Sequence, residues 1–353
     1  MISNNFIMKN IYDLSFAEID TFIKDCGEAG FRSKQIWEGL YQLHNSNWDE
    51  FSSLPKSLRE RLGSEYSLQS LVKIESVFSK DLQTEKVLFQ LADSKFIESV
   101  LLRKDDRLTL CISSQSGCAV GCVFCATGNL GLKRNLTSGE MIEQVIYFIN
   151  ILKPKSEKLT NIVLMGMGEP FLNYENTIAS VDRLNDAGGL NIGARRITIS
   201  TIGIIDRIKE FSEKEMQINL SISLHAPNDQ LRQQLVPLAK KYPIKDLIEV
   251  CRFYITKTNR RVTFEYVMIK GINDSPKLAS ELFALLRGLN CHLNLIPLNP
   301  NMHFSGKPSD PSTIREFGRI LIEKGIAASI RDSQGSDIQA GCGQLAGKRI
   351  GIQ

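Results

Sequence analysis

From Thr137 onward the chain alternates predicted helices with short apolar strands, and this alternation constrains the fold more than any other feature. Helices expected over residues 138–152, 175–187, 203–212, 244–257, 276–288 and 312–324 each precede a β-rich run: NIVLMG, RITIS, INLSISL, VTFEYVMI, CHLNLIP and AASIR. Strands that alternate with helices at this spacing form parallel βαβ units. Together with the earlier strand RLTLCIS, the pattern predicts six or seven units, fewer than the eight of a complete barrel. We therefore predict an α/β fold built on a partial (β/α)6-type barrel.

Two shorter regions precede the alternating part. Residues 1–70 show helical spacing, as in Ile19, Phe22 and Ile23, with Asp13 and Ser15 as helix start signals. The next residues contain the β-like runs VKIESVFS, EKVLFQLA and FIESVLLR, which suggest a small antiparallel sheet. We predict a small helical domain over 1–70, a β extension over 71–107, and the barrel domain over 108–353.

Composition limits the class of protein. The chain has 353 residues, of which 42% are hydrophobic and 23% charged, so it can bury a core and is not globally disordered. The longest uncharged stretch begins at Leu108, but its glycines and polar residues exclude a membrane span. The start, MISNNFIMKN, has no signal-peptide core. We expect a cytoplasmic protein with no membrane partner, and the net charge of +4 is compatible with RNA without indicating it.

Cysteine spacing points to a metal site. Four of the eight cysteines fall between positions 111 and 125, and Cys118-x3-Cys122-x2-Cys125 lies in a glycine-rich loop. Three thiolates from one loop can hold three corners of a [4Fe–4S] cluster and leave the fourth iron for another ligand. A structural zinc site is the alternative, but it needs four ligands, and the nearest downstream histidine, His225, lies far along the chain.

Polar clusters fall where several of the predicted strands end. They comprise Gly166–Pro170, Ser200–Thr201, Ser223–His225 and Asn299–Pro300. In parallel α/β folds this edge is where ligands bind. Each cluster by itself also fits a hydrogen-bonded strand end without a ligand, but their joint placement beside the cysteine loop favours a binding site.

Longer motifs resemble one family. CISSQSGCAVGCVFCATG, RNLTSGE, LMGMGEP, ISTIGI, LSISLHAPND, NLIPLNP and DIQAGCGQLAG, with FRSKQIWEGLY near the start, are similar to the RlmN family of the radical S-adenosylmethionine (SAM) superfamily. The likeness runs almost end to end. It implies a radical SAM barrel, one [4Fe–4S] cluster held by three cysteines, and two SAM molecules per turnover. The implied reaction is methylation of adenine C2 in 23S rRNA, at the peptidyl transferase centre, and in tRNA.

The resemblance also assigns catalytic roles. Adenine C2 is an electron-poor carbon that cannot attack the methyl group of SAM, so the family uses a radical route. In that scheme Cys342 carries the methyl group as S-methylcysteine and becomes bonded to the RNA, Glu98 accepts a proton, and Cys111 resolves the adduct through a transient disulfide. From the residues alone, Cys111 also fits a buried core cysteine and Glu98 a solvated strand face. Gly341 and Gly343 would give Cys342 a mobile loop.

The resemblance further implies a set of cofactor contacts and partners. The positions that match SAM contacts are Gly168, Glu169, Ser200, Ser223, Leu224, His225 and Asn299. We expect His225 to donate a hydrogen bond rather than act as a base. The implied partners are 23S rRNA, tRNA and an electron donor such as flavodoxin or ferredoxin, and we expect a monomer. The helical domain is the candidate for gripping RNA, and basic doublets such as Lys133–Arg134 could meet phosphates.

Three other functions compete with this interpretation. A Cfr-type methyltransferase would modify C8 of the same rRNA adenine with the same parts. An activase that makes a glycyl radical on a partner would need neither Cys111 nor Cys342. A non-catalytic iron–sulfur or zinc RNA-binding module would not cleave SAM.

Overall fold

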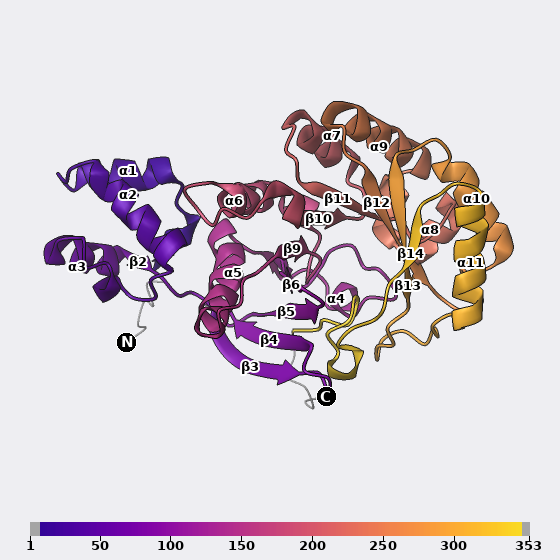
Figure 1. Ribbon diagram of the computed structural model, residues 1–353, viewed down its shortest axis with the longest axis horizontal. Coiled ribbons are helices and arrows are strands. Elements are labelled where there is room, and N and C mark those ends of the chain that lie inside the picture. Colours follow the sequence, from indigo (N-terminus) through magenta and orange to yellow (C-terminus); the bar gives the residue numbers. More distant parts are fainter. Residues whose placement is uncertain (1–7, 348–353) are drawn as a thin grey trace.

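The computed structural model describes residues 8–347, and Figure 1 shows a helical N-terminal unit beside a larger α/β body. A ten-stranded sheet organises that body, in the order β14-β13-β12-β11-β10-β9-β6-β5-β4-β3. From β6 to β14 neighbouring strands run parallel, whereas β3 to β6 pair antiparallel. The strands are β3 (Val72–Phe78), β4 (Thr84–Gln90), β5 (Phe96–Lys104), β6 (Arg107–Cys111), β9 (Asn161–Leu164), β10 (Ile197–Thr201), β11 (Asn219–Ser223), β12 (Val262–Met268), β13 (Cys291–Pro297) and β14 (Ala328–Ile330).

The sheet confirms the predicted α/β fold and its partial barrel. Within the described residues β14 and β3 are the sheet edges, so the barrel stays open. The predicted antiparallel β extension is also confirmed, since β3, β4 and β5 pair antiparallel and β5 joins them to β6 of the same sheet.

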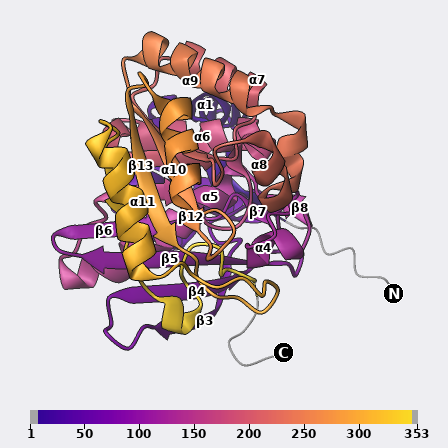
Figure 2. The same cartoon turned by 90° about the vertical axis from the view of Figure 1, so that its right-hand side faces the viewer.

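Helices connect the parallel strands and cover the outside of the sheet, as Figures 1 and 2 show. They are α5 (Ser138–Leu152), α6 (Tyr174–Asn185), α7 (Ile205–Glu213), α8 (Asp229–Leu235), α9 (Ile244–Thr258), α10 (Pro276–Leu286) and α11 (Pro311–Glu323). The short helix α4 (Ala126–Asn129) and the paired strands β7 (Gln115–Ser116) and β8 (Arg134–Asn135) lie in the loop after β6. Six of the longer helices match the predicted ranges closely, whereas the sequence pattern did not reveal α8.

Local sequence explains where these elements begin. Thr137 caps α5, and Glu140 completes a capping box by accepting from the Thr137 N–H. In β12 almost every side chain is buried, as expected for a strand covered on both faces. The carboxyl ends of the parallel strands consequently meet at one edge inside the open barrel.

The N-terminal unit is built from α1 (Phe16–Asp25), α2 (Phe31–Glu38) and α3 (Lys56–Glu65), closed by the parallel pair β1 (Lys9–Asn10) and β2 (Tyr66–Ser67). Ser15 caps α1, as its sequence suggested. Asp13 instead accepts a 2.7 Å hydrogen bond from the Gly139 N–H at the start of α5. Trp37 donates to Asp186 after α6 at 3.2 Å. The unit is therefore fastened to the barrel through α5 and α6.

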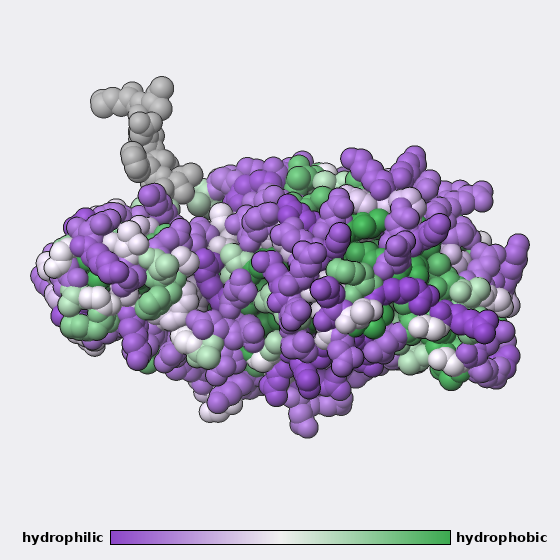
Figure 3. All heavy atoms as spheres, turned by 90° about the horizontal axis from the view of Figure 1, so that it is seen from above, coloured by the Kyte–Doolittle hydropathy of each residue, from purple (hydrophilic) through white to green (hydrophobic). Residues whose placement is uncertain are grey.

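The surface is mainly polar on the face that Figure 3 shows, with apolar patches between charged side chains over the barrel half. Among residues 8–347, no helix combines the length and apolar character needed to span a membrane.

Candidate active site at the carboxyl ends of the strands

The loop after β6 brings the three spaced cysteines together. The charges of Cys118 and Cys125 act on Cys122, so the three thiols are neighbours. Burial raises the pKa of the Cys118 thiol to about 12, and burial also raises the pKa values of Cys122 and Cys125. Such a group of thiols binds metal only as thiolates. A positively charged cluster is what would compensate three negative charges buried together.

Hydrogen-bond donors already point at these sulfurs. The Val120 N–H lies against Cys118, and the Thr127 and Gly128 N–H groups lie against Cys125 at the start of α4. N–H donors to the sulfur ligands are among the interactions that tune iron–sulfur clusters. The donor set therefore fits a cluster held by Cys118, Cys122 and Cys125.

The loop supplies three thiols, one fewer than the four ligands of a structural zinc site. Across the part of the chain that the structure describes, no three His, Cys, Asp or Glu side chains form a group that could hold one metal ion. Zinc needs four ligands on a single ion. An iron–sulfur cube has no such requirement, because each thiolate binds a different iron.

A C-terminal loop lies directly on the cysteine loop. The Ala126 N–H donates to the Gly343 carbonyl at 2.7 Å, and Thr127 Oγ1 donates to the Leu345 carbonyl at 2.6 Å. Cys342 comes directly before these contacts; the residue is exposed, yet desolvation by the surrounding protein raises the pKa of its thiol to about 11. The C-terminal loop thus places Cys342 next to the cysteine loop.

Cys111 lies at the end of β6 beside this loop. It is half-buried, and the charge of the Cys342 thiol adds to the effect of burial in raising the pKa of Cys111. Two cysteines from opposite ends of the barrel domain are therefore neighbours. All eight cysteines are free thiols in this structure.

Glu98 on β5 is buried, so its interpretation as a solvated strand residue was wrong. Its side chain is 1% exposed and pairs with Lys86 of β4 at 2.9 Å. Its other carboxylate oxygen accepts from the Ala346 and Gly347 N–H groups at 2.7 and 3.0 Å. The carboxylate therefore faces the C-terminal loop that carries Cys342.

Gly168 and Glu169 follow β9 at the same edge. Gly168 has φ +109°, and a Cβ there would lie 2.8 Å from the Gln115 backbone nitrogen, so only glycine fits. Burial raises the pKa of Glu169 to about 7, although its carboxylate accepts from the Phe171 and Ile202 N–H groups. A buried carboxylate at a strand end suits an ammonium group of a ligand.

The other predicted contacts line the neighbouring strand ends. Ser200 lies on β10, Ser223 closes β11 with Leu224 and His225 after it, and Asn299 follows β13. Asn299 Nδ2 donates to the Cys342 carbonyl at 3.1 Å, so in this structure it holds the C-terminal loop.

His225 is held as a neutral side chain. Its Nδ1 accepts from the Val267 N–H at 3.1 Å, and burial lowers its pKa to about 3. The proton of the neutral ring therefore sits on Nε2. The ring packs edge-on against Phe124 of the cysteine loop. This arrangement agrees with a hydrogen-bond donor and leaves no basic Nδ1.

Three buried charged residues in or beside the site were not found from the sequence. Glu265 of β12 accepts from Ser221 and Asn294, and its charge reaches Cys342. Arg232 of α8 lies fully buried near Cys122, and Lys86 pairs with Glu98. A charged residue inside an otherwise apolar strand run, as in VTFEYVMI, is the signal that could have revealed Glu265.

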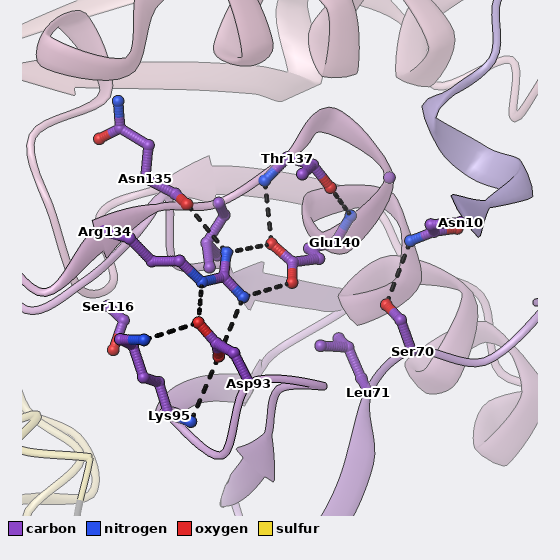
Figure 4. A network of polar contacts seen from close by, with 12 residues as sticks. Asn10, Ser70, Leu71, Asp93, Lys95, Ser116, Arg134, Asn135, Thr137 and Glu140 are labelled. Atoms are coloured by element: carbon purple, nitrogen blue, oxygen red, sulfur yellow. Dashed lines mark hydrogen bonds and ion pairs between the residues drawn. The ribbon is translucent and has the colours of Figure 1, made fainter. Parts of the chain in front are cut away.

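Arg134 forms a network of ion pairs beside the site. Figure 4 shows its guanidinium between Asp93 and Glu140. Nε lies 2.6 Å from the Asp93 carboxylate, and two further nitrogens donate to Glu140 at 2.7 Å. The network ties the exit of the cysteine loop to α5, and contact between this basic doublet and phosphates stays a prediction.

Comparisons with known proteins agree with this geometry. Residues 112–282 match the radical SAM superfamily, and residues 9–68 match the ribosomal RNA large subunit methyltransferase N-terminal domain. The dual-specificity RNA methyltransferase RlmN 1 of Myxococcus xanthus is 42% identical over 95% of this chain and 94% of its own. The probable dual-specificity RNA methyltransferase RlmN of Thermotoga maritima is 46% identical over 97% of this chain and 99% of its own.

A solved structure shows the same fold over nearly the whole chain. The radical SAM methyltransferase from Sphaerobacter thermophilus superposes with a TM-score of 0.94 at 47% identity, covering 96% of this chain and 100% of that one. The family matches over residues 9–68 and 112–282, the full-length relatives and this fold agree with one another. The chain therefore belongs to the RlmN family of radical SAM methyltransferases.

Proposed function

We propose that this protein methylates C2 of adenine in 23S rRNA and in tRNA, with Cys342 as the carrier of the methyl group. The observation that carries the proposal is the meeting of Cys342 with both Cys111 and the Cys118–Cys125 loop. A methyl carrier must reach the cofactor site for loading and a second thiol for release. The loop that carries Cys342 lies next to both the cysteine loop and Cys111.

The cofactors are assigned to the residues that fit them. Cys118, Cys122 and Cys125 would hold one [4Fe–4S] cluster. The residues proposed for SAM are Gly168, Glu169, Ser200, Ser223, Leu224, His225 and Asn299. When bound, these groups supply the 5′-deoxyadenosyl radical that removes a hydrogen atom from a methyl group.

Cys342 performs the transfer. Its sulfur accepts a methyl group from a first SAM, and a second SAM is consumed when that S-methyl carbon loses hydrogen. The resulting carbon radical adds to adenine C2, so that Cys342 is covalently attached to the RNA. The adduct then loses the C2 proton and one electron, which the oxidised cluster would accept. The glycines on both sides of Cys342 let its loop approach the base closely.

Glu98 and Cys111 complete the reaction. Oε1 of Glu98 accepts only from Lys86 among the described contacts, and we assign the C2 proton to this oxygen. The Cys111 thiolate then attacks the Cys342 sulfur, so that the S–S bond forms as the bond from Cys342 to the CH2 group breaks. The released CH2 carbon takes up a proton and becomes the methyl group of the RNA. A reductant must open this disulfide before the next turnover.

The partners follow from the chemistry. The radical step needs single electrons, for which we propose a donor of the flavodoxin or ferredoxin type. We assign RNA contact to the helical unit within residues 1–70, with the β extension (71–107) and the barrel (108–353) building the site. The protein is proposed to act as a monomer in the cytoplasm, where its thiols stay reduced and its RNA substrates are found.

The test follows the methyl group. The anaerobically reconstituted protein is incubated with SAM labelled in its methyl group and a reductant, and the cysteine peptides are then weighed by mass spectrometry. The proposal predicts label on Cys342 and none on Cys111. RNA that becomes methylated while no cysteine carries label would contradict it.

A further inference from the structure

One face of the β extension contacts the C-terminal segment. The strand register places Lys86 opposite Val100, and Val100 opposite Cys111, so the three side chains form a row on one face. Glu98 lies two residues before Val100 on β5 and shares this face. The other face packs on α5, where Ser99 donates to Gln144 at 2.7 Å. The row therefore belongs to the inner side of the open barrel.

The C-terminal segment touches this face on both sides of Cys342, and Figures 1 and 2 both show it beside β4 and β5. Before the cysteine, Lys86 Nζ donates to the Gln339 carbonyl at 3.3 Å. After it, the Ala346 and Gly347 N–H groups donate to Glu98 Oε2. The loop that carries Cys342 is thus held at its two ends by two side chains.

These two side chains form a buried ion pair. Lys86 is 5% exposed and Glu98 1% exposed. Two charges taken out of water are stable only when further hydrogen bonds satisfy them. Here Lys86 donates to a loop carbonyl, and Glu98 accepts from two loop N–H groups. The loop backbone supplies the partners that the pair needs, so the pair favours the docked loop.

The segment also makes neutral hydrogen bonds with Ala126, Thr127 and Asn299, whereas the Lys86–Glu98 pair holds it through buried charges. Lys104 pairs with Asp332, and the Lys80 N–H donates to Asp337, but both contacts are exposed to water. We infer that the Lys86–Glu98 pair is the latch that holds the Cys342 loop in the site, with Lys86 as a positioning residue for the Cys342 sulfur. The effect of Lys86 on methylation of Cys342 rests on the proposed function. The docking of the Cys342 loop can be measured without turnover.

Hydrogen–deuterium exchange of the reconstituted holoprotein tests the latch. The amides of Ala346 and Gly347 are compared in the wild type, Lys86→Met, Lys86→Arg and Lys73→Met. Lys73 is an exposed lysine of β3 and serves as the matched control. Loss of one charge-assisted anchor predicts about tenfold faster exchange of the two amides in Lys86→Met. Barrel amides stay unchanged, Lys86→Arg restores protection, and Lys73→Met behaves as wild type.

Two results would overturn the latch: exchange in Lys86→Met at the wild-type rate, or faster exchange spread over the whole barrel. If Lys86→Met does not fold, the same exchange is measured in the double variant Lys86→Met/Glu98→Gln. This variant leaves no unpaired buried charge. Faster exchange at the two amides supports the latch, and wild-type exchange contradicts it.

Labelling Cys342 with methyl-labelled SAM distinguishes the latch from the proposed function. With the latch, Lys86→Met slows S-methylation of Cys342 about tenfold and Lys86→Arg restores it. A wild-type protein that never methylates Cys342, but shows the predicted exchange, would overturn the proposed function and leave the latch intact.

Discussion

At the scale of single residues, the site depends on five thiols in different surroundings. Cys118, Cys122 and Cys125 are packed near one another under N–H donors. Cys342 is open to solvent on a glycine-flanked loop, and Cys111 sits at a strand end beneath it. These surroundings assign different chemistry to cysteines that look alike in the sequence.

Replacing Cys118 by Ala is expected to remove the cluster. Two remaining thiolates cannot hold three corners of the cube, so iron and sulfide content should fall to background and methylation should stop. Chemical analysis of iron and sulfide after reconstitution measures this. Cys26→Ala, in the helical unit, is the control and should keep its iron. A Cys118→Ala protein that still methylates RNA would contradict the radical mechanism.

Replacing Cys111 by Ala should trap the RNA. Without the resolving thiol the Cys342 sulfur stays bonded to the base, so a protein–RNA adduct accumulates to about one per enzyme. A denaturing gel detects the adduct, and peptide mass spectrometry locates it on Cys342. Cys291→Ala, a half-buried cysteine of β13, is the control and should turn over normally. Normal turnover by Cys111→Ala would refute the assigned pair.

At the scale of elements, α5 joins the helical unit to the barrel through one buried carboxylate. Glu143 accepts from the Ser70 and Leu71 N–H groups at 2.7 and 3.0 Å and also from the Asn10 side chain. Figure 4 shows Asn10 and Ser70 next to each other at this junction. Burial raises the pKa of Glu143 to about 7.

This carboxylate predicts a pH-dependent junction. Because its pKa is higher in the folded state than in the unfolded chain, the folded state binds more protons between about pH 4.5 and 7. Its contribution is fully present below that range and is lost as the pH rises through it. The wild type should lose about 1 kcal/mol of unfolding free energy per pH unit relative to Glu143→Gln.

Urea unfolding at several pH values measures this difference. Both tryptophans, Trp37 and Trp48, lie in the helical unit, so their fluorescence reports on it. Glu213→Gln, an exposed residue of α7, is the control and should follow the wild type. Equal pH slopes for the wild type and Glu143→Gln would show that Glu143 does not titrate in this range.

The elements also show what the sequence could predict. Apolar periodicity placed α5 within its observed bounds, because fifteen residues give several turns of pattern. Helix α8 has seven residues, too few for the period to show. Spacing could group the three cysteines proposed for the cluster, because they are close in sequence. Lys86 could not be found this way, because its partners, Glu98 and the Gln339 carbonyl, are distant in the chain.

At the scale of the whole molecule, the helical unit lies to one side of the barrel and leaves its own helices exposed (Figure 1). The barrel is occupied by the cysteine loop, the strand ends and the C-terminal segment. We therefore expect the unit to bring RNA to the site. A target adenine must leave its stack to reach Cys342, since base chemistry of this kind needs an accessible ring.

Charge reversal on the helical unit tests whether this unit binds RNA. Lys34 and Lys56 are exposed lysines of α2 and α3. Lys34→Glu/Lys56→Glu should weaken tRNA binding about tenfold and lower the salt slope by about one to two, because phosphate contacts are lost. Lys209→Glu/Lys277→Glu makes the same charge change on outer barrel helices and should bind normally. Equal loss in both variants would indicate a general charge effect, and no loss in the first would exclude these lysines.

The central claim is the carbon that receives the methyl group, and one measurement addresses it directly. The reconstituted protein reacts anaerobically with SAM, a reductant and either 23S rRNA fragments or tRNA, and the digested nucleosides are compared with standards by mass spectrometry. The account predicts 2-methyladenosine from both RNAs. Formation of 8-methyladenosine, or of 5′-deoxyadenosine without any methylated adenosine, would contradict it.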